Sequence, residues 1–252
     1  MSSNTLATNE VIHDLLGFKH RKIIQRTDRF HFSLDTVLLA DFVRFTGRQK
    51  KVLDLGTGNG PIPLFLSAKS TAHITGIELQ EDMVALAQKN VILNQLEKHI
   101  TIIHLDINAV PTHFPSSQFD IVTCNPPFFK VPKQAHLNEN QALSLSRHEL
   151  AIDLEGIMVA AKHALKQNGA LYMVHRAARL QDILVACETA RFRLKRGRFV
   201  YPKTGSDAMV VLLEFRFDAR SEAKFEPPLI VHHEDGTYTE EVQAIFTNRE
   251  AL

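Results

Sequence analysis

Residues 51–60 read KVLDLGTGNG, and this short stretch decides the fold. Its first half, residues 51–55, is an apolar strand that carries one acidic residue, Asp54, near its end. Its second half has glycine at every other position. Pro61 follows in the first turn of a predicted helix, where a missing N–H costs little. A strand, a glycine-rich turn and a helix in this order predict a unit of an α/β sheet with a ligand site at the turn.

Predicted strands and helices alternate along the rest of the chain. Apolar runs predict strands at residues 73–78, 100–105, 119–124 and 170–175, and a final strand pair at 192–201 and 208–217. Apolar residues at helical spacing predict helices at residues 10–16, 33–45, 82–96, 150–166 and 177–190. This order predicts a doubly wound, Rossmann-like α/β fold with a seven-stranded sheet. Because no helix separates the last two strands, we expect an antiparallel strand at one edge of the sheet.

Composition limits the classes of protein to consider. The chain has 252 residues, of which 44% are hydrophobic, and this suits one large domain with short additions. We predict an N-terminal extension at residues 1–46, a cofactor-binding domain at 47–218 and a C-terminal tail at 219–252. The formal net charge of +1 argues against a strongly basic polyelectrolyte binder, so any contact with nucleic acid must come from local patches.

Cysteine usage and hydropathy indicate the compartment. The two cysteines, Cys124 and Cys187, have no metal-ligand spacing to histidines, so we expect a reducing environment without disulfides or a bound metal. Residues 1–10 lack the apolar core of a signal peptide, and no apolar run approaches the roughly 20 residues that span a bilayer. The sequence therefore predicts a cytoplasmic protein without membrane contact.

Acidic residues stand at or just past the ends of three predicted strands: Asp54, Glu78 and Asp106. Ligands of doubly wound sheets bind beyond these carboxyl ends. A dinucleotide fingerprint fits poorly, because its third glycine would fall at Pro61 and its pyrophosphate would be repelled by Asp54. S-adenosylmethionine fits better, since its ammonium group needs an acceptor.

In this interpretation Glu78 accepts the ribose hydroxyls and Asp106 accepts from the amino group of the cofactor's adenine. The alternatives are solvated strand-end carboxylates and a glycine-rich turn without a ligand. The predicted cofactor site comprises Asp54, Gly56, Thr57, Gly58, Asn59, Gly60, Glu78, Asp106 and Asn125.

A second motif, Asn125-Pro126-Pro127-Phe128, follows the predicted strand at residues 119–124. Prolines restrict φ and lack an N–H, so this turn presents acceptors rather than donors. The Asn125 amide oxygen and the Pro126 carbonyl can accept both hydrogens of a planar amino group on adenine, guanine, cytosine or glutamine. Phe128 can stack on that planar group. We therefore predict Asn125, Pro126, Pro127 and Phe128 as the catalytic set, with a plain Asn-Pro-Pro turn as the alternative.

The two motifs together resemble class I methyltransferases that act on exocyclic or amide nitrogens. Phe30–Ala40 is similar to the element before the cofactor domain in bacterial valine-tRNA adenine-N6-methyltransferases, and Arg147–Glu149 and Pro202–Ala208 are similar to later blocks of that family. The resemblance covers most of residues 11–235. It implies that S-adenosylmethionine is the cofactor and that the substrate is N6 of an adenine beside the anticodon of tRNA.

Other functions share part of this pattern. An N5-glutamine protein methyltransferase uses the same Asn-Pro-Pro-aromatic turn, but usually has a separate N-terminal helical domain for which residues 1–46 leave little room. An rRNA guanine-N2 or a DNA adenine methyltransferase is also compatible. A non-catalytic RNA- or nucleotide-binding protein is disfavoured, because binding alone does not need the acceptor pair at Asn125 and Pro126.

Two basic clusters are candidates for contact with RNA phosphates. One is Lys19, Arg21, Lys22, Arg26 and Arg29, and the other is Arg191, Arg193, Lys195, Arg196, Arg198 and Lys203. The alternative is an ordinary solvated face, since strand alternation at residues 192–200 can place arginines outward. Arg147-His148-Glu149 is not a zinc motif, because position 152 is Ile152. This segment can hold the preceding loop or contact the substrate, and the alternative is a charge cluster at the start of a helix.

Overall fold

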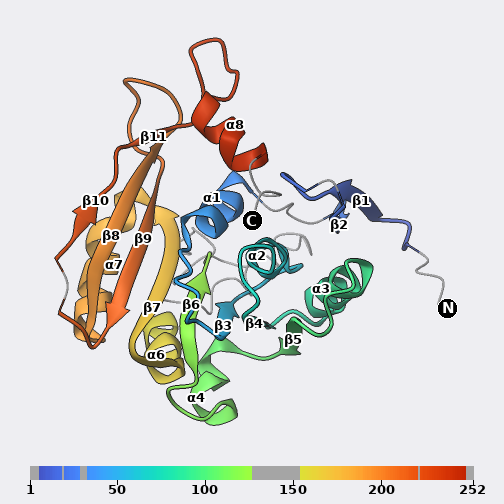
Figure 1. Ribbon diagram of the computed structural model, residues 1–252, viewed down its shortest axis with the longest axis horizontal. Helices are drawn as coiled ribbons and strands as arrows, with labels where there is room; N and C mark the ends of the chain where they lie inside the picture. The colour runs from blue at the N-terminus through green and yellow to red at the C-terminus, as the bar shows by residue number, and fades with distance from the viewer. Residues whose placement is uncertain (1–5, 19, 29–32, 127–153, 221, 248–252) are drawn as a thin grey trace, which may run out of the picture.

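The computed structural model describes residues 6–18, 20–28, 33–126, 154–220 and 222–247. Within these residues, the largest element is a nine-stranded sheet in the order β10-β8-β9-β7-β6-β3-β4-β5, with β11 paired to β8 (Figure 1). Its strands are β3 (Lys51–Leu55), β4 (His73–Glu78), β5 (Ile100–His104), β6 (Phe119–Cys124), β7 (Leu165–Arg176), β8 (Phe192–Tyr201), β9 (Val210–Phe217), β10 (Lys224–Phe225) and β11 (Leu229–Ile230).

The predicted doubly wound α/β fold is confirmed, with one correction at the end of the sheet. Strands β3 to β7 are mutually parallel, and β9 is the antiparallel strand. It lies between β7 and β8 and not at the edge, because the second strand of the final hairpin pairs with β7 and leaves the first outside. Beyond β8, the short strands β10 and β11 add parallel pairs.

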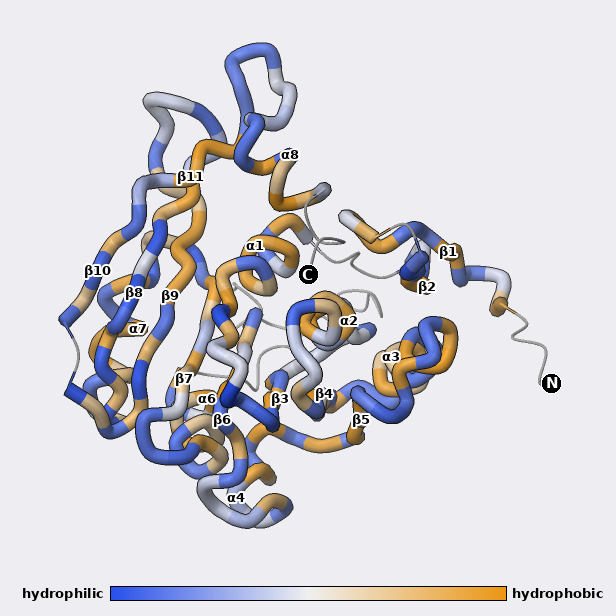
Figure 2. Tube along the Cα trace, in the orientation of Figure 1, coloured by the Kyte–Doolittle hydropathy of each residue, from blue (hydrophilic) through white to orange (hydrophobic). Residues whose placement is uncertain are grey.

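Helices cover both faces of the sheet (Figure 1). One face carries α1 (Leu34–Phe42), α2 (Pro61–Leu66) and α3 (Glu81–Leu93), and the other carries α4 (Val110–His113), α6 (Leu154–Ala164) and α7 (Leu180–Thr189). The central strands are therefore buried on both sides and consist of near-continuous apolar runs, as for Val52 and Leu53. Figure 2 shows these runs as orange segments inside the sheet, with polar segments at its margins.

A separate two-stranded sheet precedes this domain. Strands β1 (Glu10–Asp14) and β2 (Lys22–Arg26) pair antiparallel, so the predicted helix at residues 10–16 is wrong. Gly17 adopts a φ of 84° in the connecting turn, which the helical spacing of the apolar residues did not reveal. Tertiary pairing overrides that spacing, because Ile23 and Ile24 of β2 are buried against the domain.

The segment after residue 218 packs onto the same core. It contributes β10, β11 and α8 (Glu240–Thr247), and buries Leu229, Val231 and Val242. Among the described residues, no group of three or more metal-ligating side chains occurs. In the same part of the chain, none of the helices has the length and apolar character that would let it cross a membrane.

Candidate active site

Four predicted site residues lie at one edge of the sheet. Strands β6, β3, β4 and β5 are adjacent and parallel, so their carboxyl ends meet there. Asp54 is near the end of β3, Glu78 ends β4, Asp106 follows β5 and Asn125 follows β6. The structure thus brings these polar groups to the edge at which doubly wound folds bind ligands.

The glycine loop, residues 56–60, turns sharply over this edge. Gly56, Gly58 and Gly60 have φ values of 69°, 57° and 88°, which side-chain-bearing residues rarely adopt. At Gly60 an added Cβ would lie 3.4 Å from Cβ of Ala87, so glycine also permits the close approach of the loop to α3. At Gly58 the nearest described atom to an added Cβ would be Cε of Met83, at 4.0 Å, which leaves room above the loop.

Asp54 is fully buried, and one of its oxygens is satisfied. Its Oδ1 accepts a hydrogen bond of 2.6 Å from the hydroxyl of Thr123 on β6. Its Oδ2 has no hydrogen-bond partner among the described residues. Burial raises the pKa of Asp54 to about 7, the hydroxyls of Thr123 and Thr57 oppose this rise, and the charge of Glu78 adds to it. A buried carboxylate oxygen of this kind suits a cationic donor from a ligand.

The other two carboxylates organise the backbone beside the loop. Oε2 of Glu78 accepts from the N–H of Gly58 and Oε1 from the N–H of Gln80, each at 2.9 Å. Oδ1 of Asp106 accepts from the N–H of Asn108 at 2.8 Å and begins the short helix η1 (Ile107–Ala109). Each carboxylate oxygen has more than one acceptor position, so these bonds leave capacity for a ligand.

Two residues of the glycine loop turn their side chains inward. The Thr57 side chain packs over Gly76 of β4, where an added Cβ would lie 2.8 Å from the Thr57 hydroxyl. The Asn59 side chain is buried and donates to the carbonyl of Ile24 at 3.1 Å. Both residues can therefore meet a ligand through their main chain, whereas their side chains hold the loop in place.

The N-terminal hairpin is bound to this loop through Asn90 of α3. Its Oδ1 accepts from the N–H of Ile24 at 2.6 Å, and its Nδ2 donates to the carbonyls of Ile24 and Asn59 at 3.1 and 2.9 Å. Asn90 is completely buried. One amide thus joins β2, α3 and the glycine loop, a connection that the sequence analysis missed.

Asn125 is held by α1, across the edge from the glycine loop. Its Nδ2 donates to the hydroxyl of Thr36, in the first turn of α1, at 3.0 Å. This bond assigns the NH₂ group of the amide to the protein and leaves its oxygen as the acceptor for another group. Pro126 is buried beside it. Pro127 and Phe128 lie outside the described residues, as do the loop after them and Arg147-His148-Glu149.

Comparison with known proteins identifies the family. Residues 47–215 match the family described as "Methyltransferase domain", which is more than half of the chain. The chain belongs to the methyltransferase domain family. The glycine loop, the three carboxylates and Asn125 all lie within the matched residues.

Two curated relatives of this methyltransferase carry the same name, tRNA1(Val) (adenine(37)-N6)-methyltransferase. The protein of Aeromonas hydrophila is 28% identical over 89% of this chain and 92% of its own length. That of Porphyromonas gingivalis is 28% identical over 90% and 91%. The resemblance drawn from the sequence motifs is therefore confirmed along most of the chain.

A solved structure supports the fold. The crystal structure of a predicted O-methyltransferase, protein Atu636 from Agrobacterium tumefaciens, superimposes with a TM-score of 0.67. It covers 86% of this chain and 97% of its own, at 22% sequence identity. At this identity the likeness concerns the architecture alone.

In the first predicted basic cluster, the two arginines that the structure describes bind other groups of this methyltransferase. Arg21 donates to the carbonyl of Leu64 and to the hydroxyl of Ser67, and burial lowers the pKa of its guanidinium. Arg26 forms ion pairs with Asp28 and Asp82. These arginines fasten the hairpin to α2 and α3, while Lys19 and Arg29 lie outside the described residues.

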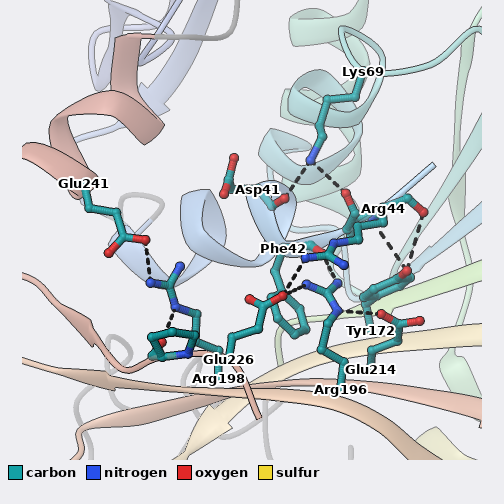
Figure 3. A network of polar contacts seen from close by, with 12 residues as sticks. Asp41, Phe42, Arg44, Lys69, Tyr172, Arg196, Arg198, Glu214, Glu226 and Glu241 are labelled. Carbon is teal, nitrogen blue, oxygen red and sulfur yellow. Dashed lines mark hydrogen bonds and ion pairs between the residues drawn. The ribbon is translucent and has the colours of Figure 1, made fainter. Parts of the chain in front are cut away.

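The arginines of the second basic cluster are also paired with acidic side chains, and Arg196, a candidate for contact with RNA, is buried instead. Arg196 is buried, forms ion pairs with Glu214 and Glu226, and donates to the carbonyl of Phe42 (Figure 3). A register shift in β8 between Leu194 and Arg196 breaks the expected alternation and turns this side chain beneath α1. Arg191, Arg193 and Arg198 pair with Asp218, Glu188 and Glu241.

We expect the Asn90 amide to determine the affinity for S-adenosylmethionine. In Asn90→Ala the N–H of Ile24 and the carbonyl of Asn59 lose their partner, and each unsatisfied buried group costs roughly 1–3 kcal/mol. The glycine loop should then move, and the dissociation constant of the cofactor, measured by calorimetry, should rise about tenfold or more, a loss of roughly 1.4 kcal/mol.

Asn94 provides a matched control for this change. It makes the same two backbone bonds to the hairpin, with Lys22 at 2.9 and 2.7 Å, but lies one turn further from the glycine loop. Asn94→Ala should lower the free energy of unfolding and leave cofactor affinity within about twofold. Equal losses of affinity in the two variants would show that the hairpin as a whole, and not the Asn90 contact, supports the loop.

Proposed function

We propose that this methyltransferase transfers a methyl group from S-adenosylmethionine to N6 of an adenine in tRNA, next to the anticodon. The observation that carries this proposal is the orientation of Asn125. With its NH₂ group bound to Thr36, it presents an oxygen acceptor at the carboxyl edge. The names of the curated relatives, which specify adenine-N6 and tRNA1(Val), support the same substrate class.

The site residues fit S-adenosylmethionine. The unpartnered Oδ2 of Asp54 suits an ammonium group, and the open space at Gly58 admits a ligand against bare backbone. Glu78 and Asp106 supply acceptors further along the same edge, for ribose hydroxyls and an adenine amino group. When bound, the cofactor supplies a methyl group on a sulfonium, which is electrophilic without a metal.

The contribution of Asn125 to the reaction is to accept a hydrogen bond from the amino group of the substrate adenine. The amino nitrogen of adenine is a poor nucleophile, because its lone pair is delocalised into the ring. Acceptance of its two hydrogens by the Asn125 oxygen and the Pro126 carbonyl favours a tetrahedral nitrogen with a localised lone pair. Fixed orientation of the reacting groups can contribute roughly 7–11 kcal/mol, and the surplus proton leaves the nitrogen after transfer.

Asp54 makes cofactor binding dependent on pH. The pKa of Asp54 is raised from 3.8 to about 7 in the folded chain. Folding therefore favours the protonated acid, and this stabilisation is complete below pH 3.8 and lost as the pH rises to about 7. Above that pH the buried carboxylate costs up to roughly 4 kcal/mol, at 1.36 kcal/mol for each unit. A bound ammonium group offsets part of that cost.

We therefore expect Asp54→Asn to stabilise the ligand-free protein at pH 8 by a few kcal/mol, and to do so less as the pH falls below about 7. Cofactor affinity should rise with pH through about 7 in the wild type and be low and independent of pH in the variant. Urea denaturation and calorimetry at several pH values measure both. If Asp54→Asn binds the cofactor like the wild type, Asp54 does not contact the cofactor.

Substrate class is tested by the transfer of a labelled methyl group. The protein is incubated with labelled S-adenosylmethionine and, separately, with bulk tRNA, rRNA, double-stranded DNA and a protein lysate freed of nucleic acid. We expect label in tRNA. Label in protein, rRNA or DNA instead would replace the proposed substrate and leave the assignment to the methyltransferase family intact.

A further inference from the structure

Strand β2 runs along α3 toward the carboxyl edge of the sheet. Its first residue binds the C-terminal cap of α3, and its last residue, Arg26, pairs with Asp82 in the first turn of that helix. Because α3 follows β4, this first turn lies at the edge that carries Glu78. Just before Arg26, the carbonyl of Ile24 accepts from Asn59 of the glycine loop. The end of β2 is therefore fastened beside the candidate cofactor site.

Gln25 stands between these two fastened residues and is only 6% exposed. Side chains alternate along a strand, so the Gln25 side chain lies on the same face of β2 as that of Ile23. Ile23 belongs to the hydrophobic cluster that also contains the buried side chains of α2 and α3. Gln25 therefore also points toward the domain, but nearer the carboxyl edge, where the glycine loop joins α2.

The amide oxygen of Gln25 is buried without a hydrogen bond. Among the described residues, three buried side-chain atoms lack a hydrogen-bond partner: Oδ2 of Asp54, Oγ1 of Thr57 and Oε1 of Gln25. Two of the three belong to β3 and the glycine loop, at the candidate cofactor site. A buried polar group without a partner costs free energy, and a bound ligand can supply the missing bond. The position of Gln25 beside the loop indicates that the same ligand completes its bonding.

The glycine loop has few N–H groups left for an anionic group of a ligand. The N–H groups of Thr57, Gly58 and Gly60 already donate to other groups of the protein, at 2.9 Å each. The first turn of α2 contains Pro61 and Pro63, which have no N–H to donate. A carboxylate bound at the loop therefore needs a donor from another part of the chain.

The amino-acid end of S-adenosylmethionine carries an ammonium group and a carboxylate, which need opposite partners. Asp54, Glu78 and Asp106 supply acceptors along this edge, but their charges repel a carboxylate. The neighbouring Arg26 is already paired with two aspartates. The amide of Gln25 can rotate about its last bond and present its NH₂ group, so it offers a neutral donor.

We propose that the amide of Gln25 binds the carboxylate of the amino-acid end of S-adenosylmethionine, while Asp54 accepts from its ammonium group. This inference rests on the cofactor site described under the proposed function. The N-terminal hairpin then takes part in cofactor binding directly, in addition to holding the glycine loop through Asn90 and Asn59. Gln25 selects ligands that carry this carboxylate over adenosine derivatives that lack it.

The test uses three ligands that differ at the amino-acid end. Calorimetry measures the affinity for S-adenosylmethionine, for its decarboxylated form, which keeps the ammonium group, and for 5′-methylthioadenosine, which lacks both charges. Gln25→Met keeps the length of the side chain and removes both hydrogen-bonding groups, and Gln25→Glu keeps its shape and replaces the donor by an acid. The matched control is Gln88→Met on α3, where the exposed Gln88 donates to the carbonyl of Ile102 on β5. Melting temperatures without ligand are measured in parallel.

We expect Gln25→Met to bind S-adenosylmethionine about tenfold or more weakly, because a hydrogen bond to a charged group is lost. Its affinity for the other two ligands should match the wild type. Its melting temperature without ligand should equal or exceed that of the wild type, since an unpartnered buried oxygen is removed. Gln25→Glu should lose affinity for S-adenosylmethionine and not for the decarboxylated form, and Gln88→Met should bind all three ligands normally.

Two results would overturn the role of Gln25. One is wild-type affinity of Gln25→Met for S-adenosylmethionine, and the other is an equal loss for all three ligands, which would mean that Gln25 acts only through the shape of the loop. Asp54→Asn should instead weaken S-adenosylmethionine and its decarboxylated form alike, because both keep the ammonium group. Failure of that result would count against the cofactor site itself, and failure to methylate tRNA would count against the proposed substrate alone.

Discussion

Asn125→Ala should lower the turnover number by about a hundredfold or more while cofactor affinity remains within about twofold of the wild type. The amide oxygen accepts from the substrate amino group, and this bond strengthens as the nitrogen becomes tetrahedral, so its removal affects the transition state more than the bound ground state. Among the described residues, the Asn125 side chain hydrogen-bonds to Thr36 and to no residue of the glycine loop, which is why we expect the cofactor to bind normally. Single-turnover transfer of label, together with calorimetry on the same protein, measures both quantities.

Variants of Thr36 test whether activity depends on the orientation of the Asn125 amide and not only on correct folding. Thr36→Val keeps the size of the side chain but removes the acceptor for Nδ2 of Asn125, so the amide can rotate and present its NH₂ group to the substrate. We expect turnover to fall about tenfold, and Thr36→Ser, which keeps the hydroxyl, to retain most of it. Equal activity in Thr36→Val and the wild type would mean that the amide orientation does not depend on α1.

The largest loss of stability is expected from Arg196→Ala. Arg196 joins β8 to β9 through Glu214 at 2.8 Å, to the C-terminal segment through Glu226 at 2.9 Å, and to the end of α1 through the carbonyl of Phe42 at 2.6 Å (Figure 3). Its guanidinium also lies 3.7 Å from the centre of the Phe42 ring. Removal of one partner from a buried ion pair costs roughly 3–5 kcal/mol, because the remaining charge is left buried.

Arg193→Ala is the matched control for Arg196→Ala. Arg193 is three residues earlier on the same strand, with a side chain 52% exposed and an ion pair to a still more exposed partner, Glu188. Exposed pairs of this kind contribute about 0–1 kcal/mol, so the free energy of unfolding should barely change. Urea denaturation of both variants decides the point. A loss below about 1 kcal/mol in Arg196→Ala would show that Arg216, which also pairs with Glu214, replaces it.

The buried arginine belongs to a polar row that crosses the sheet under α1. Its members are in-register neighbours on successive strands and are all buried: Asp54, Thr123, Tyr172, Glu214 and Arg196. The row begins at the site carboxylate and ends at the Phe42 carbonyl, the last turn of the helix that holds Asn125. Lys69 donates to three carbonyls at that same helix end, Ala40, Asp41 and Val43. These contacts fix α1 against the sheet.

Local sequence patterns were sufficient for the parts of the fold that depend on neighbours in the chain. The strand, glycine turn and helix at residues 51–66 form as predicted, because the turn needs glycine and the strand is apolar on both faces. The same holds for β4 and β6, whose predicted ends place Glu78 and Asn125 at the carboxyl edge.

Parts that depend on distant partners could not be predicted. The residues at 10–16 have helical apolar spacing, yet they pair as a strand because β2 is held by Asn90, more than sixty residues away. The register shift beside Arg196 leaves no local signal, so the strand was expected to place its arginines outward. Thr36 was assigned only to a helix start, since its contact with Asn125 spans most of the first half of the chain.

We propose that the amide of Asn125 directs a methyl group to the exocyclic nitrogen of adenine. The most direct measurement is mass spectrometry of nucleosides from tRNA that has been incubated with the wild type, or with Asn125→Ala, and labelled S-adenosylmethionine. We expect labelled N6-methyladenosine from the wild type and little or none from the variant. Label in N2-methylguanosine, label at another position of adenine, or equal labelling by the two proteins would contradict it.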